Sequence, residues 1–263
     1  IRDYKVTGVQ TCALPIFLYL ERPDFPSEEE QFRAYREAAS AMEGKRVVIR
    51  TLDIGADKQA EYFHLPKEEN PALGMRAIRL CLTRPEIFRT QLRALCRASA
   101  FGKIAVMFPM ITSLDELRRA RALTRNIQKE LAAEHIPFND KMEWGIRFET
   151  PSAAIISNLL PKEADFFSIG TNDLIQYTLA ADRQNRSISS FYDPHHEAVI
   201  RLIRLTCKNA RENKIWVGVC GELAADPSLT TEFLSLGIDE LSVAPPSILP
   251  TRASVCESGP LSL

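Results

Sequence analysis

The sequence lacks the features that mark several large classes of protein. No apolar run approaches the roughly 18–20 residues that a membrane-spanning helix needs. The six cysteines form no Cys-x-x-Cys pair, so we expect reduced cytosolic thiols rather than zinc ligands or a disulfide framework. Neither sign of charge is in excess, because 33 Lys and Arg face 34 Asp and Glu, for a net charge of −1. That balance removes the bulk electrostatic case for a nucleic-acid or membrane-surface protein.

Two nucleotide-binding motifs are also missing. No Gly-x-Gly-x-x-Gly follows the first β-branched run, and no P-loop motif occurs in the sequence. What the chain does have is 263 residues, of which 45% are hydrophobic. This is enough for a substantial core in one large domain or two small ones.

The first sixteen residues differ from the rest. Residues 12–20 (CALPIFLYL) superficially resemble a signal-peptide core, but no small-residue cleavage pattern follows, so we do not expect secretion. Residues 6–16 (VTGVQTCALPI) resemble the translation of a common sequencing-adapter oligonucleotide. We therefore interpret residues 1–16 as an artefact and exclude them from fold reasoning, with an unusual natural N-terminus as the alternative.

From residue 17 onward, short β-branched runs alternate with amphipathic helical patterns. Several runs are almost entirely apolar, as expected for parallel strands covered on both faces. The strand candidates are 47–52, 77–80, 104–107, 144–148, 166–169, 215–219 and 240–243. This alternation favours a single α/β domain, either a doubly wound sheet or a (β/α)₈ barrel with one strand missing. The spacing alone does not separate the two.

Helix starts are marked by local capping signals. Ser27 and Ser113 each stand three residues before a Glu, which fits the capping box. Three further starts place a capping side chain before a proline, at Thr150, Asp193 and Asp226.

Polar and charged residues stand at the carboxyl ends of four strand candidates. They are Arg50, Glu149, Gly-Thr-Asn-Asp at 170–173 and Cys-Gly-Glu at 220–222. In a barrel all parallel strand ends meet at one face, and a doubly wound sheet gathers some of them at its switch point. Carboxylates, cations, an amide and a thiol on one rim indicate a metal-assisted site for an anionic substrate.

Each of these residues also has a simpler interpretation. Arg50 alone is more often a solvated salt-bridge partner, and Glu149 suits the positive end of the next helix. Asp173 fits a turn or helix cap, and Cys220 fits an inert buried thiol. The repeated placement on four strands favours the site over these separate explanations.

Six segments of the chain form a recognisable set. They are RTLDIGADK (50–58), NPALGMRAIR (70–79), FETP (148–151), FFSIGTNDLIQY (166–177), DR (182–183) and CGELA (220–224). Together they resemble the phosphoenolpyruvate-binding barrel of enzyme I of the bacterial sugar phosphotransferase system. The likeness covers about residues 17–250 in order. Pyruvate phosphate dikinase and phosphoenolpyruvate synthase share the GTND-type segment, whereas CGELA and PKEENPALG are more similar to enzyme I. A dikinase or synthase barrel therefore remains an alternative.

The resemblance implies an incomplete (β/α)₈ barrel and Mg²⁺-dependent phosphoryl transfer. The intact parent would move phosphate from phosphoenolpyruvate to its own His, then to a phosphocarrier protein, which starts sugar uptake. By the same resemblance Glu149 and Asp173 would ligate Mg²⁺. Cys220 would protonate the methylene carbon of the departing enolate, giving pyruvate.

The remaining residues implied by the resemblance are contacts to the substrate anion. Arg50 and Arg183 would grip the phosphate. Asn172, with local backbone, would hold the carboxylate or phosphate end, and Asp173 would contact the substrate as well as the metal ion. Lys58 and Arg76 would be further anion contacts.

The chain departs from the family pattern in three respects. An Arg that precedes the family's opening strand falls near Leu14, within the adapter-like residues, and we expect the first barrel strand to be lost with it. The phosphorylatable His and the carrier-binding helices belong to an N-terminal region that is not in this sequence. The likeness fades after Pro250, so we expect 17–250 to be the barrel and 251–263 a truncated tail. The parent would be a cytoplasmic homodimer, and a non-catalytic dimerisation fragment is the non-enzyme alternative.

Overall fold

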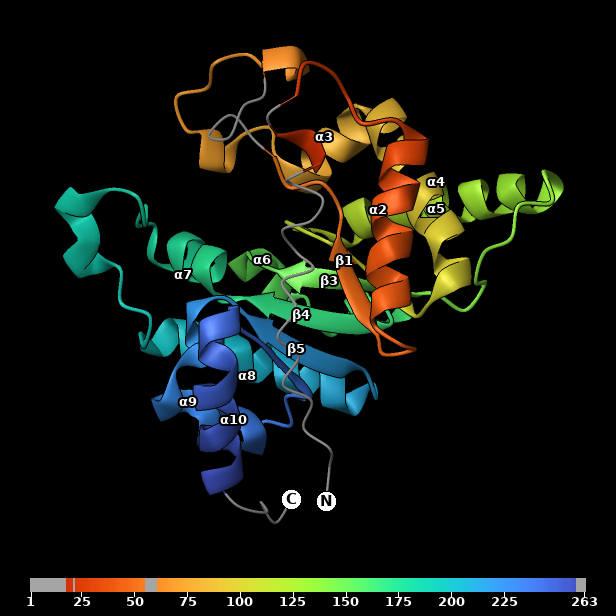
Figure 1. Ribbon diagram of the computed structural model, residues 1–263. Coiled ribbons are helices and arrows are strands. Elements are labelled where there is room, and N and C mark those ends of the chain that lie inside the picture. Colours follow the sequence, from red (N-terminus) through yellow and green to blue (C-terminus); the bar gives the residue numbers. More distant parts are fainter. Residues whose placement is uncertain (1–17, 21, 55–60, 259–263) are drawn as a thin grey trace. The chain divides into compact units, whose positions relative to one another are not determined.

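The computed structural model of the chain describes residues 18–20, 22–54 and 61–258 (Figure 1). The expected artefact at residues 1–16 and the predicted anion contact Lys58 lie outside the described residues. The chain divides into two compact units. We call residues 18–20, 22–54, 61–110 and 114–145 the N-terminal unit, and residues 111–113 and 146–258 the C-terminal unit.

Helices and strands alternate along both units. The N-terminal unit contains α2 (Glu28–Ala41), β1 (Val47–Arg50), α3 (Ala77–Thr83), α4 (Pro85–Ala98), β2 (Ile104–Phe108) and α5 (Leu114–Ala133). Strand β3 (Glu143–Phe148) begins in this unit and ends in the next. The C-terminal unit continues with α6 (Pro151–Ile155), β4 (Phe166–Gly170), α7 (Thr171–Leu179), α8 (Glu197–Glu212), β5 (Trp216–Cys220), α9 (Pro227–Ser235), β6 (Glu240–Ser242) and α10 (Ile248–Glu257).

The six described strands belong to one sheet, and their order in the sheet is their order in the chain, β1-β2-β3-β4-β5-β6. Strand β1 pairs with β2 in parallel, and β4, β5 and β6 form a parallel ladder. A doubly wound sheet reverses its strand order at a switch point, which this sheet does not do. Unbroken chain order is the arrangement of a (β/α)₈ barrel, so the predicted incomplete α/β barrel is confirmed.

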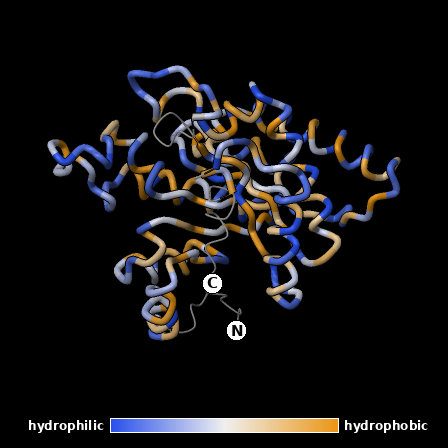
Figure 2. Tube along the Cα trace, turned by 45° about the horizontal axis from the view of Figure 1, so that its top comes forward, coloured by the Kyte–Doolittle hydropathy of each residue, from blue (hydrophilic) through white to orange (hydrophobic). Residues whose placement is uncertain are grey.

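The core lies along the strands. Every residue of β2 and of β4 is buried, as the continuous apolar runs predict for strands covered on both faces. Along the helices, by contrast, hydrophobic and hydrophilic residues follow one another at short intervals (Figure 2). In α5, for example, Leu117, Ala120 and Ile127 are buried at helical spacing.

Most of the predicted helix starts are correct. Ser27 and Glu30 form the expected capping box at the start of α2, and α5 begins directly after Ser113. Thr150 caps α6 by accepting a hydrogen bond from the backbone N–H of Ala153, and Asp226 caps α9 in the same way. Short-range capping signals therefore predict these helix positions well.

Two local predictions are wrong. Residues 77–80 form the first turn of α3 rather than a strand, and the N–H of Ala77, at φ 51°, donates to the carbonyl of Ile54. A short apolar run does not distinguish a strand from a buried helix. Asp193 does not start α8. It accepts a hydrogen bond from the N–H of His195 within a turn, and His196 caps the helix instead.

The C-terminal boundary predicted at residue 250 falls within α10. The division into a barrel and a truncated tail stays a prediction.

Candidate functional site

Glu149 follows the last residue of β3 and is fully buried. Its Oε1 lies 3.1 Å from Nε of Arg147, which is two residues earlier and therefore on the same side of the strand. Gly170, at the end of β4, leaves room for both side chains. A Cβ at Gly170 would lie 2.6 Å from Nε of Arg147 and 2.9 Å from Cγ of Glu149. Sequence reasoning did not place Arg147 at this position.

The predicted residues Asn172 and Asp173 form the first turn of α7, directly after β4. Asp173 is 4% exposed, and its Oδ1 lies 3.4 Å from Nη1 of Arg183. The amino end of a helix favours a carboxylate, because its unpaired N–H groups carry partial positive charge. The strand-to-helix junction thus brings Asp173 close to one of the predicted phosphate contacts.

Asn172 links this junction to the end of β5. Its Oδ1 accepts a hydrogen bond of 3.0 Å from the backbone N–H of Glu222, so its amide nitrogen remains as the donor end. Thr171 Oγ1 donates to the carbonyl of Cys220 at 3.0 Å. Gly221 has φ 97°, and a Cβ there would meet Thr171 Oγ1 and come within 2.8 Å of Asn172 Oδ1. Only glycine suits this close approach.

Cys220 lies opposite Gly170 in the β4–β5 register and is 6% exposed. Its Sγ is 3.4 Å from the carbonyl oxygen of Ile169 and 3.7 Å from Oγ of Ser168. The thiol is therefore held among polar groups at the strand end rather than in a purely apolar pocket.

Tyr192 is a site neighbour that the motifs did not reveal. Its hydroxyl donates a hydrogen bond of 3.0 Å to the carbonyl of Asn172. Burial raises the pKa of Tyr192 to about 12, so the hydroxyl remains a donor at neutral pH. No sequence signal marks a contact between residues twenty positions apart.

Two predicted cations of the N-terminal unit are joined by one carboxylate. Asp53 Oδ2 lies 2.7 Å from Nη1 of Arg50, and Asp53 Oδ1 lies 3.0 Å from Nη2 of Arg76. All three residues are less than 10% exposed. The end of β1 is held by a further buried hydrogen bond, from the N–H of Leu52 to Oε1 of Gln91 in α4. The two guanidinium groups therefore share the carboxylate of Asp53, and guanidinium groups are suited to binding an anion.

The structure thus assembles the predicted residues in two groups. In the C-terminal unit it gathers Glu149, Asn172, Asp173, Arg183 and Cys220 on segments that meet around Gly170. In the N-terminal unit it gathers Arg50 and Arg76. Within the described residues no group of three or more His, Cys, Asp or Glu side chains is arranged to hold a metal ion. The two buried carboxylates near Gly170 are those of Glu149 and Asp173.

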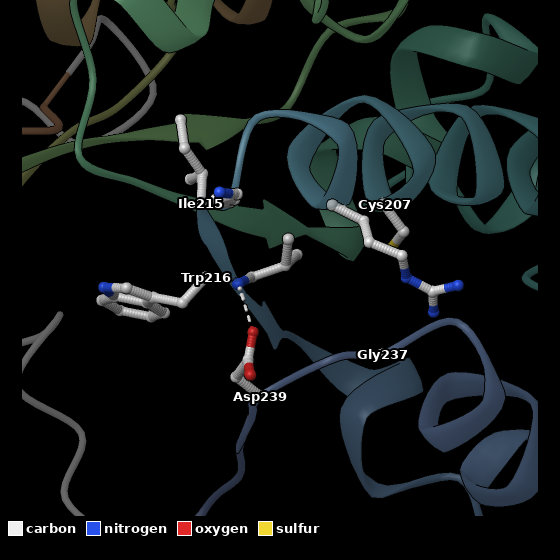
Figure 3. Close-up of a pocket in the computed structure, with 8 residues that line it drawn as sticks. Cys207, Ile215, Trp216, Gly237 and Asp239 are labelled. Atoms are coloured by element: carbon white, nitrogen blue, oxygen red, sulfur yellow. Dashed lines mark hydrogen bonds between the residues drawn. The ribbon is translucent and has the colours of Figure 1, made fainter. Parts of the chain in front are cut away.

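A separate cavity of about 490 Å³ lies at the amino end of β5, at the opposite end of the strand from Cys220 (Figure 3). It is lined by Cys207, Arg211, Lys214, Ile215, Trp216, Val217, Gly237 and Asp239. None of the predicted site residues that the structure describes contributes to it. No helix in the part of the chain that the structure describes has the length and apolar character needed to cross a membrane.

Comparison with known proteins identifies the family of the chain. The family described as PEP-utilising enzyme, PEP-binding domain, matches residues 14–258. The phosphoenolpyruvate-protein phosphotransferases of Priestia megaterium and Bacillus subtilis are each 51% identical over 239 residues, which is 91% of this chain and 42% of theirs. The chain thus spans less than half the length of these relatives.

Solved structures of low sequence identity share the fold. The magnesium/glyoxylate complex of Haloferax volcanii malate synthase superposes with a TM-score of 0.58 at 12% identity, covering 90% of this chain and 62% of that one. Its pyruvate/acetyl-CoA ternary complex gives 0.59 at 12% identity, covering 90% and 57%. At this identity the likeness concerns architecture alone. On the family match and the relatives at 51% identity, the chain belongs to the PEP-utilising enzymes and corresponds to their PEP-binding domain.

Proposed function

We propose that the chain is the phosphoenolpyruvate-binding domain of a phosphoenolpyruvate-protein phosphotransferase and that it binds phosphoenolpyruvate together with Mg²⁺. The observation that carries the proposal is the pair of buried carboxylates, Glu149 and Asp173, on segments that meet at Gly170. The names of the relatives at 51% identity support the same activity. A dikinase or synthase barrel is not favoured.

The donor set fits the metal ion. Mg²⁺ prefers one or two carboxylates together with substrate oxygens and water, and Glu149 and Asp173 supply that number. Each carboxylate also lies beside an arginine, Arg147 or Arg183, which would balance its charge. When bound, the metal ion would neutralise charge on the phosphoryl group and on the enolate.

Arginines would bind the anionic substrate. Phosphoryl transfer requires alignment and charge neutralisation more than covalent help, and guanidinium groups provide both through paired N–H donors. We assign this role to Arg183 in the C-terminal unit and to Arg50 and Arg76, which Asp53 holds in place. Lys58 is a further anion contact in the proposal.

Asn172 and Cys220 would act on the part of the substrate that becomes pyruvate. Asn172 would direct its amide N–H to a substrate oxygen, since its carbonyl oxygen already accepts from Glu222. Transfer of the phosphoryl group breaks the P–O bond and leaves the enolate of pyruvate. Cys220 would then give its thiol proton to the methylene carbon, which yields pyruvate and a thiolate.

The parent protein's reaction and surroundings belong to the same proposal. In the cytoplasm, the phosphate would pass to a His outside this sequence and then to a phosphocarrier protein. This transfer would start sugar uptake. We propose a homodimer for that parent, and residues 17–250 as its substrate-binding domain. The chain by itself would bind phosphoenolpyruvate weakly and would not complete the transfer.

Calorimetric titration of the chain with phosphoenolpyruvate and Mg²⁺ tests this function. We expect weak binding that is lost in Glu149→Gln and in Asp173→Asn. Glu212→Gln, an exposed glutamate of α8, serves as the control and should bind as the unmodified chain does. Binding that survives both site substitutions would refute the assignment. Formation of pyruvate by the purified chain would contradict its proposed incompleteness.

A further inference from the structure

Arg183 is carried by an exposed segment, residues 180–192, which we call the strap. It follows α7 and leads towards α8 (the turquoise region between these helices in Figure 1). Residues 182–187 and 189–191 of the strap are exposed, and the side chain of Phe191 is 70% exposed. Packing of the strap against the rest of the unit therefore does little to fix the position of Arg183. That position depends on the hydrogen bonds that anchor the two ends of the strap.

The near anchor is Gln176 in α7. The chain reverses at Ala180, which has φ 51°, and the N–H of Ala181 donates to the carbonyl of Gln176 at 3.1 Å. The backbone N–H of Arg183 then donates to Oε1 of the buried Gln176 side chain at 3.1 Å. This anchor holds the backbone of Arg183 but leaves the remainder of the strap extending into solvent.

The far anchor is Tyr192. Its half-buried side chain returns to the first turn of α7, where its hydroxyl donates to the carbonyl of Asn172. Asn172 directly precedes Asp173, whose Oδ1 lies 3.4 Å from Nη1 of Arg183. The hydroxyl thus closes a loop that begins and ends on the same short helix and carries Arg183 over its acidic first turn.

We propose that Tyr192 is the positioning residue that holds Arg183 beside Asp173, by closing the strap on the first turn of α7. The inference rests on the proposed function, in which Arg183 binds the phosphate. Closing the strap restricts Arg183 before the ligand arrives, so less conformational entropy is lost when the ligand binds. Such preorganisation strengthens binding without a new contact.

Tyr192→Phe removes only the hydroxyl and tests the proposal. In titrations of the chain with phosphoenolpyruvate and Mg²⁺, we expect a loss of affinity of roughly two- to tenfold, the range of one hydrogen bond. In an Arg183→Gln background the same change should have no further effect, because Tyr192 acts through Arg183. Arg186→Gln, an exposed cation of the strap, is the control and should bind as the unmodified chain does. An equal loss in both backgrounds would overturn the proposal.

Amide hydrogen exchange measures how well the backbone of the strap is protected, and it needs no ligand. In Tyr192→Phe, we expect faster exchange at the N–H groups of Ala181 and Arg183, with exchange in α8 unchanged. Unchanged exchange in the strap would refute the anchoring role. If the chain binds no phosphoenolpyruvate, the proposed function fails, and the exchange measurement then decides alone whether Tyr192 anchors the strap.

Discussion

The backbone N–H of Glu222 donates a hydrogen bond of 3.0 Å to the side-chain oxygen of Asn172. This contact joins the turn after β5 to the first turn of α7 and orients the amide of Asn172. The oxygen of the side-chain amide thus contributes to the fold, and in the proposed function its N–H group would bind the ligand.

Two substitutions at Asn172 separate these roles. Asn172→Asp retains the oxygen acceptor for Glu222 but replaces the amide donor with a negative charge. We expect the fold to persist and the affinity for phosphoenolpyruvate to fall at least roughly tenfold, because the proposed substrate is an anion. Asn172→Ala removes both contacts and should also lower the free energy of unfolding by about 1 kcal/mol. Calorimetry and chemical denaturation measure the two effects, and unchanged affinity in Asn172→Asp would contradict the role of the amide.

Gly170 should not tolerate a side chain. Its Cβ would lie 2.6 Å from Nε of Arg147 and 2.9 Å from Cγ of Glu149, so one of them must move. We expect Gly170→Ala to lower the free energy of unfolding by about 1–3 kcal/mol, as overpacking does, and to weaken Mg²⁺-dependent binding. Gly218→Ala in β5 is the matched control, because its Cβ would meet nothing closer than 3.4 Å. Equal stability of the two variants in chemical denaturation would argue against crowding at Gly170.

The proposed proton transfer by Cys220 can be observed in reverse. If the thiol exchanges a proton with the methylene carbon, the chain with Mg²⁺ in D₂O should catalyse deuterium incorporation into the methyl group of pyruvate. We expect Cys220→Ala to abolish this exchange, followed by NMR, and Cys207→Ala, at another buried cysteine, to retain it. Exchange that persists in Cys220→Ala would assign the proton to another group.

Acid should weaken the start of α2 through Glu30. Hydrogen bonds from the backbone and hydroxyl of Ser27, and then from Arg22, lower the pKa of Glu30 to about 2. A carboxylate whose folded pKa lies below its unfolded value contributes stability above the unfolded pKa, and loses that contribution as pH falls towards the folded pKa. The melting temperature of the unmodified chain should therefore fall towards that of Glu30→Gln between about pH 5 and pH 2.

Glu37→Gln changes another exposed glutamate of α2 and controls for the loss of one charge. Its melting-temperature difference from the unmodified chain should change less over the same pH interval. A constant difference between the unmodified chain and Glu30→Gln would show that the capping carboxylate contributes nothing to the acid dependence.

Local sequence signals predicted elements whose defining interactions span only a few residues. Ser27 and Glu30 satisfy each other's backbone N–H groups, and Thr150 caps α6, whatever the rest of the chain does. The continuous apolar runs of β2 and β4 likewise require burial on both faces. The same reasoning failed at residues 77–80, because a mostly apolar run of four residues fits a strand as well as a helix. Here the run begins α3, and the N–H of its first residue donates to the carbonyl of Ile54, a contact that the run itself does not reveal.

The sequence by itself determined the α/β class, most strand positions and the residue types that stand at the strand ends. Only the tertiary structure decided their partners: Asp53 between Arg50 and Arg76, Arg147 beside Glu149, and Tyr192 on Asn172. The physical reason is the range of the interactions. A helix cap or an apolar run is satisfied by neighbours in the chain, whereas an ion pair or hydrogen bond between distant segments exists only after strand register and loop closure bring those segments within a few ångströms.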